Sequence, residues 1–546
     1  MRLPLRSQLL AVALFSTACL LPNQPATAQG LKCTIAVLSK TPADQAFNAG
    51  DSAQAESLAA AQIATTPTAA SFMVLVHAQL DQNKLTEAMA SANSAVAALP
   101  RSAEALTLVG DAYVRSGQIP EAADVYGKAI ALDRCSAAAH FSLARLNDLV
   151  GRHAIAAKEL NFAHRLAPTD AAVAAAYLDT LPIAQRLVPL RSLLAGHPLL
   201  PPAQLNRLTN ELATLDQHLL CSSTDPYISQ RIDLEKIYQN GSEIRSWGIK
   251  TRVNDANLPL LELDSSVDGI ILKADDAAKA HVHPLTSAPT NPDAMYQAVA
   301  DEIHIGNLIF HGCPVTVVPN NVVDNRNSLI GTSFFRDHVI HIDYVAMTLT
   351  LTPLPATGNA DLTDQFISPE EKNWSPVYIA DSHLLLPTLI NKKGPYLFAL
   401  DTGSGYSILS PAVTARELAV SGDATLNLQG YAGTIVKVIP REGGAAGIVD
   451  STDVRSPSGK LLRVSRPVKL PVYRFTSNEI PDKHAVSFDL TPMSHNLGIE
   501  VSGLLGFEIL SYFSIDLNYR DGLAQVLFDQ NRRYSVRRTE DFNQVR

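Results

Sequence analysis

With 546 residues, the chain is longer than one hydrophobic core supports, and two to four domains are expected. Hydrophobic residues make up 46% of it and charged residues 18%, which is the composition of a globular protein and excludes a largely disordered one. The formal net charge is −9 and no run of Lys and Arg occurs, which argues against a nucleic-acid partner.

The N-terminus carries the pattern of a secretory signal. Arg2 and Arg6 precede an apolar stretch from Leu9 to Leu21, and the small-residue run Ala26-Thr27-Ala28 follows. We expect cleavage after Ala28, so that residues 1–28 are a signal peptide and the mature chain is exported, either periplasmic or secreted. The apolar stretch is shorter than the ~20 residues of a membrane span, so no transmembrane span is expected after signal cleavage.

Four cysteines lie in the expected mature chain, without C-x-x-C or any other metal-type spacing: Cys33, Cys135, Cys221 and Cys313. In an exported protein these residues are compatible with a disulfide or with unpaired thiols, and the sequence does not fix a pairing. The fifth cysteine, Cys19, ends the run Ser16-Thr17-Ala18-Cys19, which resembles a lipobox. A lipoprotein anchored through Cys19 is therefore the alternative to a free exported chain.

Three consecutive blocks of 34 residues match one another: 69–102, 103–136 and 137–170. Self-similarity at this period is typical of paired antiparallel helices that stack into a solenoid. Small residues recur where the two helices of a block would cross closely. These are Ala88, Ala122 and Ala156 at one equivalent position, and Ala95, Ala129 and Ala163 at another.

The middle block is the best formed of the three. It runs from Ala103 to Tyr113, turns at Ser116-Gly117-Gln118 and continues to Ala129. This block resembles the tetratricopeptide repeat (TPR) consensus, and the resemblance implies an all-α solenoid that binds a protein or peptide partner. A spacer or a dimerisation element is the alternative use of such an array.

The helical domain is expected to span residues 31–218. Residues 35–68 supply a degenerate first unit in this interpretation, and Ala171–Leu181 and Pro202–Leu219 are further helices that cap the array. Beyond it, the composition changes from Ala-rich to rich in Val, Ile, Asn, Pro and Gly, which indicates a β-rich second part.

Two segments of this second part resemble each other without a gap. One contains Asp264-Ser265-Ser266 and the other Asp401-Thr402-Gly403-Ser404. Each has the pattern of an apolar strand, a tight acidic turn and a short strand that leads into a helix. A second pair of matching segments follows later in each copy, Leu329-Ile330-Gly331 and Leu504-Leu505-Gly506.

These features resemble the retropepsin-like and pepsin-like aspartic proteases, here in a bacterial form with N-terminal TPR repeats. The resemblance implies two mainly β lobes of the acid-protease fold, residues 225–353 and 375–540, joined by a linker around 354–374 and packed about a pseudo-twofold axis. It also implies an aspartic endopeptidase that acts on a peptide or protein substrate and needs no cofactor. Asp264 and Asp401 would be the catalytic pair.

The chemistry explains why two such loops must face each other. Two carboxylates about 3 Å apart cannot both ionise, so one takes a proton from water while the other donates to the scissile carbonyl oxygen. Ser265 and Thr402, which follow the acids, are suited to hydrogen-bond across to the opposite loop, and Gly403 allows the tight turn that leads to Ser404.

Ser266 departs from the family pattern, which has Gly at this position. Its side chain would narrow the site, distort the turn or hydrogen-bond locally. The alternative function is therefore a peptide- or protein-binding scaffold that no longer cleaves. A third reading assembles the site from two copies of the second lobe in a homodimer.

The remaining patterns concern a flap and the histidines. Gly430, Tyr431 and Gly433 have the content of a hairpin tip that closes over a peptide, whereas residues 284–298 have no comparable tip. Two histidine pairs, His281 with His283 and His338 with His341, are interpreted as solvated or packing side chains, and no metal site is expected.

Overall fold

The chain is described by a computed structural model in which the helical half and large parts of the β-rich half are placed. The structure describes residues 33, 41–223, 228–239, 243–286, 291, 294–320, 327–355, 368–390, 393–404, 407–410, 412–413, 437–438, 454–455, 461–462, 468–475, 478–487, 489–511 and 513–528. The expected signal peptide, Cys19 and the predicted flap residues Gly430, Tyr431 and Gly433 lie outside this set.

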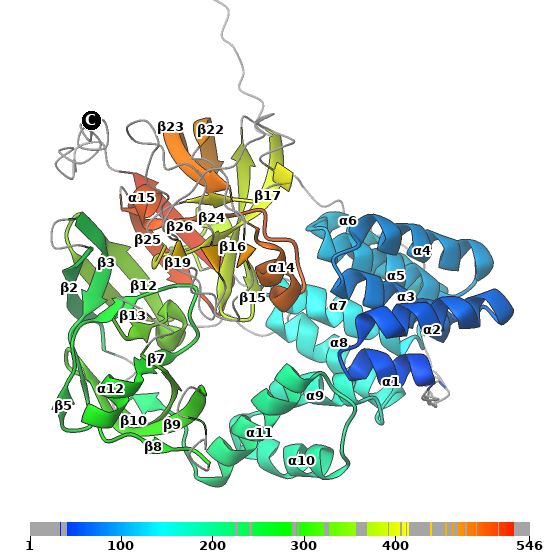
Figure 1. Ribbon diagram of the computed structural model, residues 1–546, viewed down its shortest axis with the longest axis horizontal. Coiled ribbons are helices and arrows are strands. Elements are labelled where there is room, and N and C mark those ends of the chain that lie inside the picture. The colour runs from blue at the N-terminus through cyan, green and yellow to red at the C-terminus, as the bar shows by residue number, and fades with distance from the viewer. Residues whose placement is uncertain are drawn as a thin grey trace, which may run out of the picture. The chain divides into compact units, whose positions relative to one another are not determined.

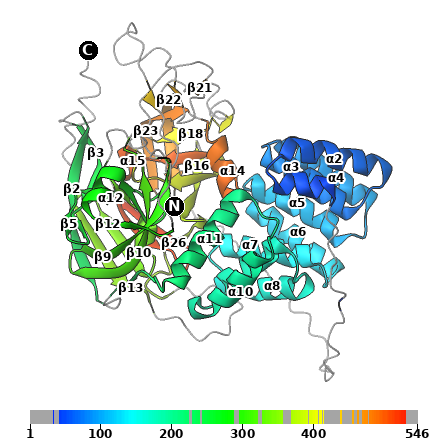
Figure 2. The same cartoon turned by 60° about the horizontal axis from the view of Figure 1, so that its bottom comes forward.

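The helical half consists of successive antiparallel helix pairs (Figures 1 and 2). The helices α3, α5 and α7 begin at residues 69, 103 and 137, so each predicted block of 34 residues is one helix pair. The pairs comprise α1 (Pro42–Asn48) with α2 (Ser52–Thr65), α3 (Ala69–Asp81) with α4 (Leu85–Ala98), α5 (Ala103–Arg115) with α6 (Ile119–Leu132), and α7 (Ala137–Leu149) with α8 (His153–Leu166).

Local sequence explains why these helices start and cross where they do. The side chains of Thr68, Ser102 and Ser136 each accept a hydrogen bond from a backbone N–H in the first turn of α3, α5 and α7. At Gly110 a Cβ atom would lie 2.3 Å from the Tyr126 ring, so α5 and α6 approach too closely for a side chain there. The recurring alanines are all buried: Ala88, Ala95, Ala122, Ala129, Ala156 and Ala163.

Beyond the repeats follow α9 (Ala171–Asp179), α10 (Ile183–Ala195) and α11 (Pro202–Asp216). These helices share a core that includes Leu178, Leu190 and Leu208. The sequence predicts α9 and α11 but not α10, because Pro189 lies inside α10 and removes one backbone donor. None of the helices in the described residues is long and apolar enough to cross a membrane.

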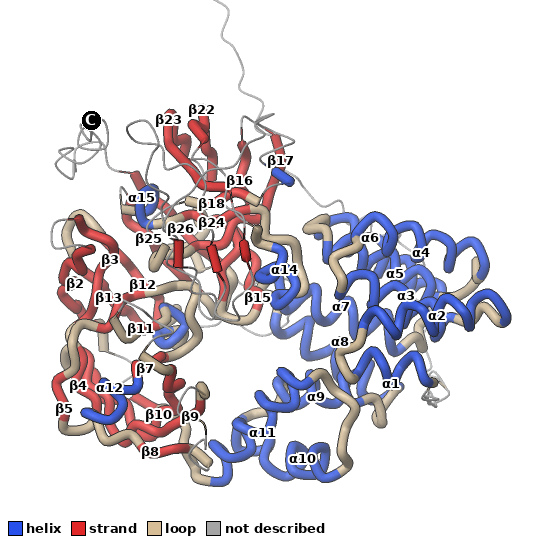
Figure 3. The backbone as a smooth tube through the Cα atoms, in the orientation of Figure 1, coloured by secondary structure: helices blue, strands red, loops and turns tan. Residues whose placement is uncertain are grey.

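Strands dominate the rest of the chain (red in Figure 3). The first β-rich part contains β1 (Ser222–Ser223), β2 (Gln230–Gln239), β3 (Glu243–Ile249), β4 (Thr251–Val253), β5 (Ala256–Asn257), β6 (Leu261–Leu263), β7 (Ile270–Lys273), α12 (Ala274–Lys279), β8 (His283–Pro284), β9 (Tyr296–Ile305), β10 (Leu308–Val318), β11 (Leu329–Ile330), the 3-10 helix η1 (Thr332–Phe335), β12 (His338–Asp343) and β13 (Thr348–Pro353).

The second β-rich part follows the same order of elements. It contains β14 (Ser375–Pro376), β15 (Tyr378–Ala380), β16 (His383–Ile390), β17 (Lys393–Leu400), β18 (Ile408–Leu409), β19 (Lys437–Val438), β20 (Val454–Arg455), β21 (Leu461–Leu462), β22 (Val468–Phe475), β23 (Asn478–Ser487), α14 (Thr491–Leu497), β24 (Gly503–Leu505), α15 (Phe507–Leu510), β25 (Phe513–Asn518) and β26 (Leu523–Phe528).

The two β-rich parts share one pairing pattern around their acidic loops. In the first, β6 pairs in parallel with β11, which pairs antiparallel with β7. In the second, β17 pairs in parallel with β24, which pairs antiparallel with β18. The strand that enters each loop and the strand that leaves it are therefore held by the same later strand, which contains the matching apolar segment.

A continuous sheet joins the two parts. Its strand order there is β14-β26-β25-β12-β13-β2, so β12 of the first part pairs directly with β25 of the second. Both strands are largely buried, and Ile340, Ile342, Ile515 and Leu517 are fully buried. Because backbone hydrogen bonds and apolar burial both cross this boundary, the two parts are fixed to each other.

The helical array packs on the second β-rich part, and both belong to one compact unit, Ile35–Arg546. Tyr126 and Leu146 of the array share an apolar cluster with Leu385, Ala399 and Leu504. At its edge the Glu500 N–H donates to the Arg115 carbonyl oxygen over 3.0 Å. The array therefore covers an apolar face that belongs to the sheet carrying Asp401.

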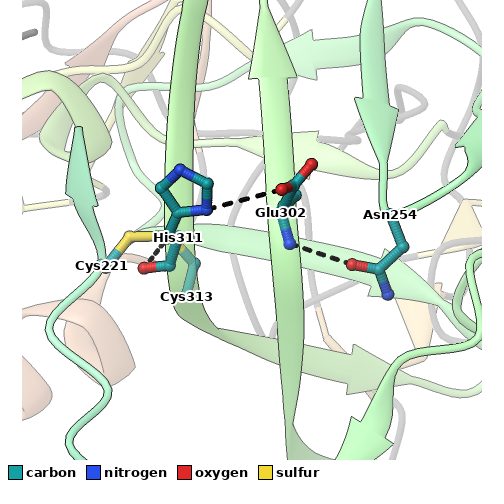
Figure 4. Close-up of a disulfide and its surroundings, with 5 residues drawn as sticks. All are labelled: Cys221, Asn254, Glu302, His311 and Cys313. Atoms are coloured by element: carbon teal, nitrogen blue, oxygen red, sulfur yellow. Dashed lines mark hydrogen bonds and ion pairs between the residues drawn. A yellow bond between two sulfur atoms is a disulfide. The ribbon is translucent and has the colours of Figure 1, made fainter. Parts of the chain in front are cut away.

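A disulfide fastens the chain where it leaves the helices (Figure 4). Cys221 follows α11 and bonds to Cys313 on β10, and the short strand β1 pairs with the same strand. On the neighbouring strand the Glu302 N–H donates to Asn254 Oδ1 over 3.1 Å, and Glu302 Oε1 lies 3.7 Å from His311 Nδ1. The disulfide thus links the end of the helical half to the β9–β10 hairpin.

Replacing both Cys221 and Cys313 by Ala is expected to lower the free energy of unfolding by about 2–4 kcal/mol, because the bond spans 92 residues and restricts the unfolded chain. Urea unfolding of the oxidised protein measures this loss. An unchanged unfolding midpoint would contradict the role given to the bond.

Candidate active site

The two acidic loops begin where buried strands end. Asp264 directly follows β6 and Asp401 directly follows β17, and both side chains are 0% exposed. Each backbone N–H is held by the strand behind the loop, since Asp264 N donates to Ile330 O and Asp401 N donates to Leu505 O, both over 3.0 Å. The matching apolar segments therefore brace both loops from the same side.

The two loops hydrogen-bond to each other reciprocally. The Ser265 N–H donates to Thr402 Oγ1 over 2.9 Å, and the Thr402 N–H donates to Ser265 Oγ over 3.0 Å. Each hydroxyl also donates across the boundary to a backbone carbonyl, Ser265 Oγ to Leu400 O over 2.7 Å and Thr402 Oγ1 to Leu263 O over 3.0 Å. Four hydrogen bonds therefore fix the two acidic turns face to face within one chain.

One oxygen of each carboxylate is held by its own turn. Asp401 Oδ1 accepts from the N–H groups of Gly403, over 3.1 Å, and Ser404, over 2.9 Å. Asp264 Oδ1 accepts from the Ser266 N–H over 3.0 Å and from Ser266 Oγ over 2.6 Å. Ser266 therefore hydrogen-bonds locally, and its hydroxyl supplies to Asp264 the second donor that the backbone of Ser404 supplies to Asp401.

A close backbone approach supports the Asp264 loop. A Cβ atom at Gly331 would lie 2.0 Å from the Val267 carbonyl oxygen, and the Gly331 N–H donates to Gly269 O over 2.7 Å. Only glycine fits there without moving the loop. In the other half, Ser404 O accepts from the Phe507 N–H over 2.6 Å, which ties the residue after Gly506 to the Asp401 loop.

Two titratable side chains near the pair were not among the predicted site residues. Burial raises the pKa of Tyr344 far above its usual range, and the charges of Asp264 and Asp401 raise it further, against the effect of Thr402. Burial lowers the pKa of His383, while the Asp381 and Asp264 carboxylates raise it. Neither has a motif, so only the pattern Asp-Tyr at the end of β12, repeated as Asn-Tyr after β25, offered a signal for Tyr344.

The histidine pairs do not form a metal site. Within the described ranges, no group of three or more His, Cys, Asp or Glu side chains is placed to hold a metal ion. His338 is buried, while His341 Nδ1 lies 2.6 Å from Asp516 Oδ1 on the paired strand β25.

Comparison with known proteins bears on the helical half. Residues 110–147 match the family model of the TPR repeat. A thermophilic TPR protein of Thermus thermophilus is 19% identical, with 31% of this chain and 95% of that chain covered and a TM-score of 0.26. MamA is 18% identical, with 33% and 98% covered and a TM-score of 0.19. The Cut9–Hcn1 hetero-tetramer of the APC/C is 18% identical, with 32% and 34% covered and a TM-score of 0.27.

No curated protein matches the chain. The TPR match and the repeated helix pairs together define a TPR-like solenoid, which is followed by a mixed, sheet-rich region. TPR repeats indicate protein binding.

The variant Gly331→Ala is expected to lower the free energy of unfolding by about 1–3 kcal/mol, because its methyl group would displace Val267 in the Asp264 loop. Gly127→Ala in α6 is the matched control, since nothing lies within 4 Å of the added atom, and it should stabilise the protein by up to about 1 kcal/mol. Urea unfolding compares the two, and equal effects would contradict the close approach.

Proposed function

We propose that this chain is an aspartic endopeptidase with Asp264 and Asp401 as its catalytic pair and water as its nucleophile. The observation that carries the proposal is the reciprocal bonding of Ser265 and Thr402, which joins two acidic turns from two similarly paired β-rich parts. The retropepsin-like arrangement of two lobes belongs to the same proposal. Its support is the shared strand pattern of β6, β11 and β7 and of β17, β24 and β18.

The proposed chemistry needs only the two carboxyl groups. A carboxylate removes a proton from water as its oxygen attacks the scissile carbonyl carbon, while the neutral carboxylic acid protonates the carbonyl oxygen. The resulting diol then collapses, the C–N bond breaks and the amine nitrogen takes up a proton, so that one water is consumed for each peptide bond. The titration belongs to the pair rather than to either residue.

The TPR-like array would bring protein substrates or partners to this site. It packs on the sheet that carries Asp401 through Tyr126 and Leu146, so a protein bound to the array is held near the proposed protease part. The proposal places the enzyme outside the cytoplasm, because the first 28 residues have the order of a secretory signal.

A binding scaffold that does not cleave is the second candidate. The observation in its favour is Ser266, whose side chain occupies the place where the family pattern has glycine and bonds Asp264 Oδ1 over 2.6 Å. Cleavage by the Ser266→Gly variant, together with none by the natural chain, would favour this candidate.

The variants Asp401→Asn and Asp264→Asn are each expected to reduce cleavage of an unfolded protein substrate by at least about 10²-fold, because an amide can neither accept the proton of water nor share one with its partner. Cleavage is measured from acid to neutral pH, with and without a statine-type inhibitor. Asp255→Asn, at an exposed turn, is the matched control and should retain full activity. Full activity in either active-site variant would remove that residue from the mechanism.

A further inference from the structure

Tyr344 and Tyr519 hold equivalent places in the two β-rich parts. The pairing of β12 with β25 is symmetric about His341 and Asp516, which lie opposite each other, with Ile340 opposite Leu517 and Ile342 opposite Ile515. Tyr344 lies three residues beyond His341 (344 − 341 = 3), and Tyr519 lies three residues beyond Asp516 (519 − 516 = 3). Both tyrosines are almost fully buried.

The two hydroxyls differ in what they meet. The Tyr519 hydroxyl lies 2.6 Å from Thr332 Oγ1, and Thr332 is the residue after Gly331. The corresponding residue after Gly506 is Phe507, and the Tyr344 ring meets it edge to face, with 5.6 Å between centroids and 86° between planes. A phenyl ring offers no hydroxyl partner, so the symmetric hydrogen bond is missing on the Tyr344 side.

The Tyr344 hydroxyl is accordingly unsatisfied. Among the residues that the structure places, it makes no hydrogen bond of ordinary geometry, although the residue is only 1% exposed. A buried hydroxyl without such a bond is unfavourable, and phenylalanine would fill the same space without it. A purely structural role does not explain the tyrosine.

The surroundings of this hydroxyl indicate a role at the acidic loops. Of the described side chains, those that act on the pKa of Tyr344 besides burial are Thr402, Asp264 and Asp401, which are the members of the bonded loops. Phe507, on which the Tyr344 ring packs, is itself bonded to the Asp401 loop through Ser404 O. The phenol therefore lies against the Thr402 side of the loop contact.

We propose that Tyr344 is a positioning residue for the Asp264–Asp401 pair, whose buried hydroxyl beside Thr402 favours negative charge on the pair and holds the Asp401 loop in place. The inference rests on the proposed function, because positioning matters only if the pair exchanges protons. Tyr344 does not touch the reacting atoms in this account, and it acts through Thr402 and through the local field.

Other ionisable groups also face this region. Glu262 on β6 accepts from Ser246 Oγ over 2.6 Å, and Asp343, beside Tyr344 in sequence, accepts from the Ala346 N–H over 2.8 Å. His383 at the start of β16 is the remaining one, and burial favours its neutral form. All of them are unchanged in the variants below.

The test compares Tyr344→Phe with Tyr519→Phe, its symmetric control, in the full chain. Tyr344→Phe should keep the stability of the natural protein and move the pH profile of cleavage upward by roughly half to one pH unit, because removing the dipole makes charge on the pair less favourable. Tyr519→Phe should lower the urea midpoint and leave the profile in place, because it loses the bond to Thr332. An unchanged profile in Tyr344→Phe, or equal shifts in both variants, would overturn the inference.

A readout that needs no catalysis separates this inference from the proposed function. The difference in unfolding free energy between the natural chain and Asp401→Asn depends on pH where the pair takes up its proton. If Tyr344→Phe shifts that dependence but the natural chain cleaves nothing, the positioning role stands and the protease proposal fails. If the dependence does not shift, the role of Tyr344 is rejected whether or not the chain cleaves.

Discussion

The rest of the β-rich half depends on the reciprocal hydrogen bonds between Ser265 and Thr402. Each residue offers a backbone N–H and a hydroxyl to the opposite loop, so neither turn is complete without the other. Because all the participating atoms are buried, the loss of one partner would leave an unsatisfied polar group in the core. This constraint brings two acidic side chains together, where each affects the protonation of the other.

Two larger contacts keep this small contact in register. The sheet that joins β12 to β25 fixes the two parts beneath the loops, and the strands β11 and β24 hold the backbone of each acidic residue. On the outer side, the TPR-like array covers the sheet that contains Ala399, two residues before Asp401. The array is therefore part of the packing around the candidate site, and a partner bound to it would act on a surface that is continuous with the Asp401 sheet.

The parts that could be predicted from sequence are those that repeat. The period of 34 residues predicts the helix pairs from α3 to α8, and the similarity of the Asp264 and Asp401 segments predicts that the two turns lie together. The sequence does not predict α10, since Pro189 argues against a helix and only tertiary packing of Leu190 compensates for it. Nor does it predict Tyr344 and His383 beside the loops or the contact of Tyr126 with Leu504, because these depend on how distant segments pack.

A double-mutant cycle with Ser265→Ala and Thr402→Val tests the central claim most directly, because it measures whether the two loops bond to each other in solution. Unfolding free energies of the natural chain, both single variants and the double variant give the coupling between the two positions. The account predicts a coupling of at least about 1 kcal/mol, since the double variant loses the shared bonds only once. Additive effects within about 0.5 kcal/mol would contradict it and would separate the two acidic loops.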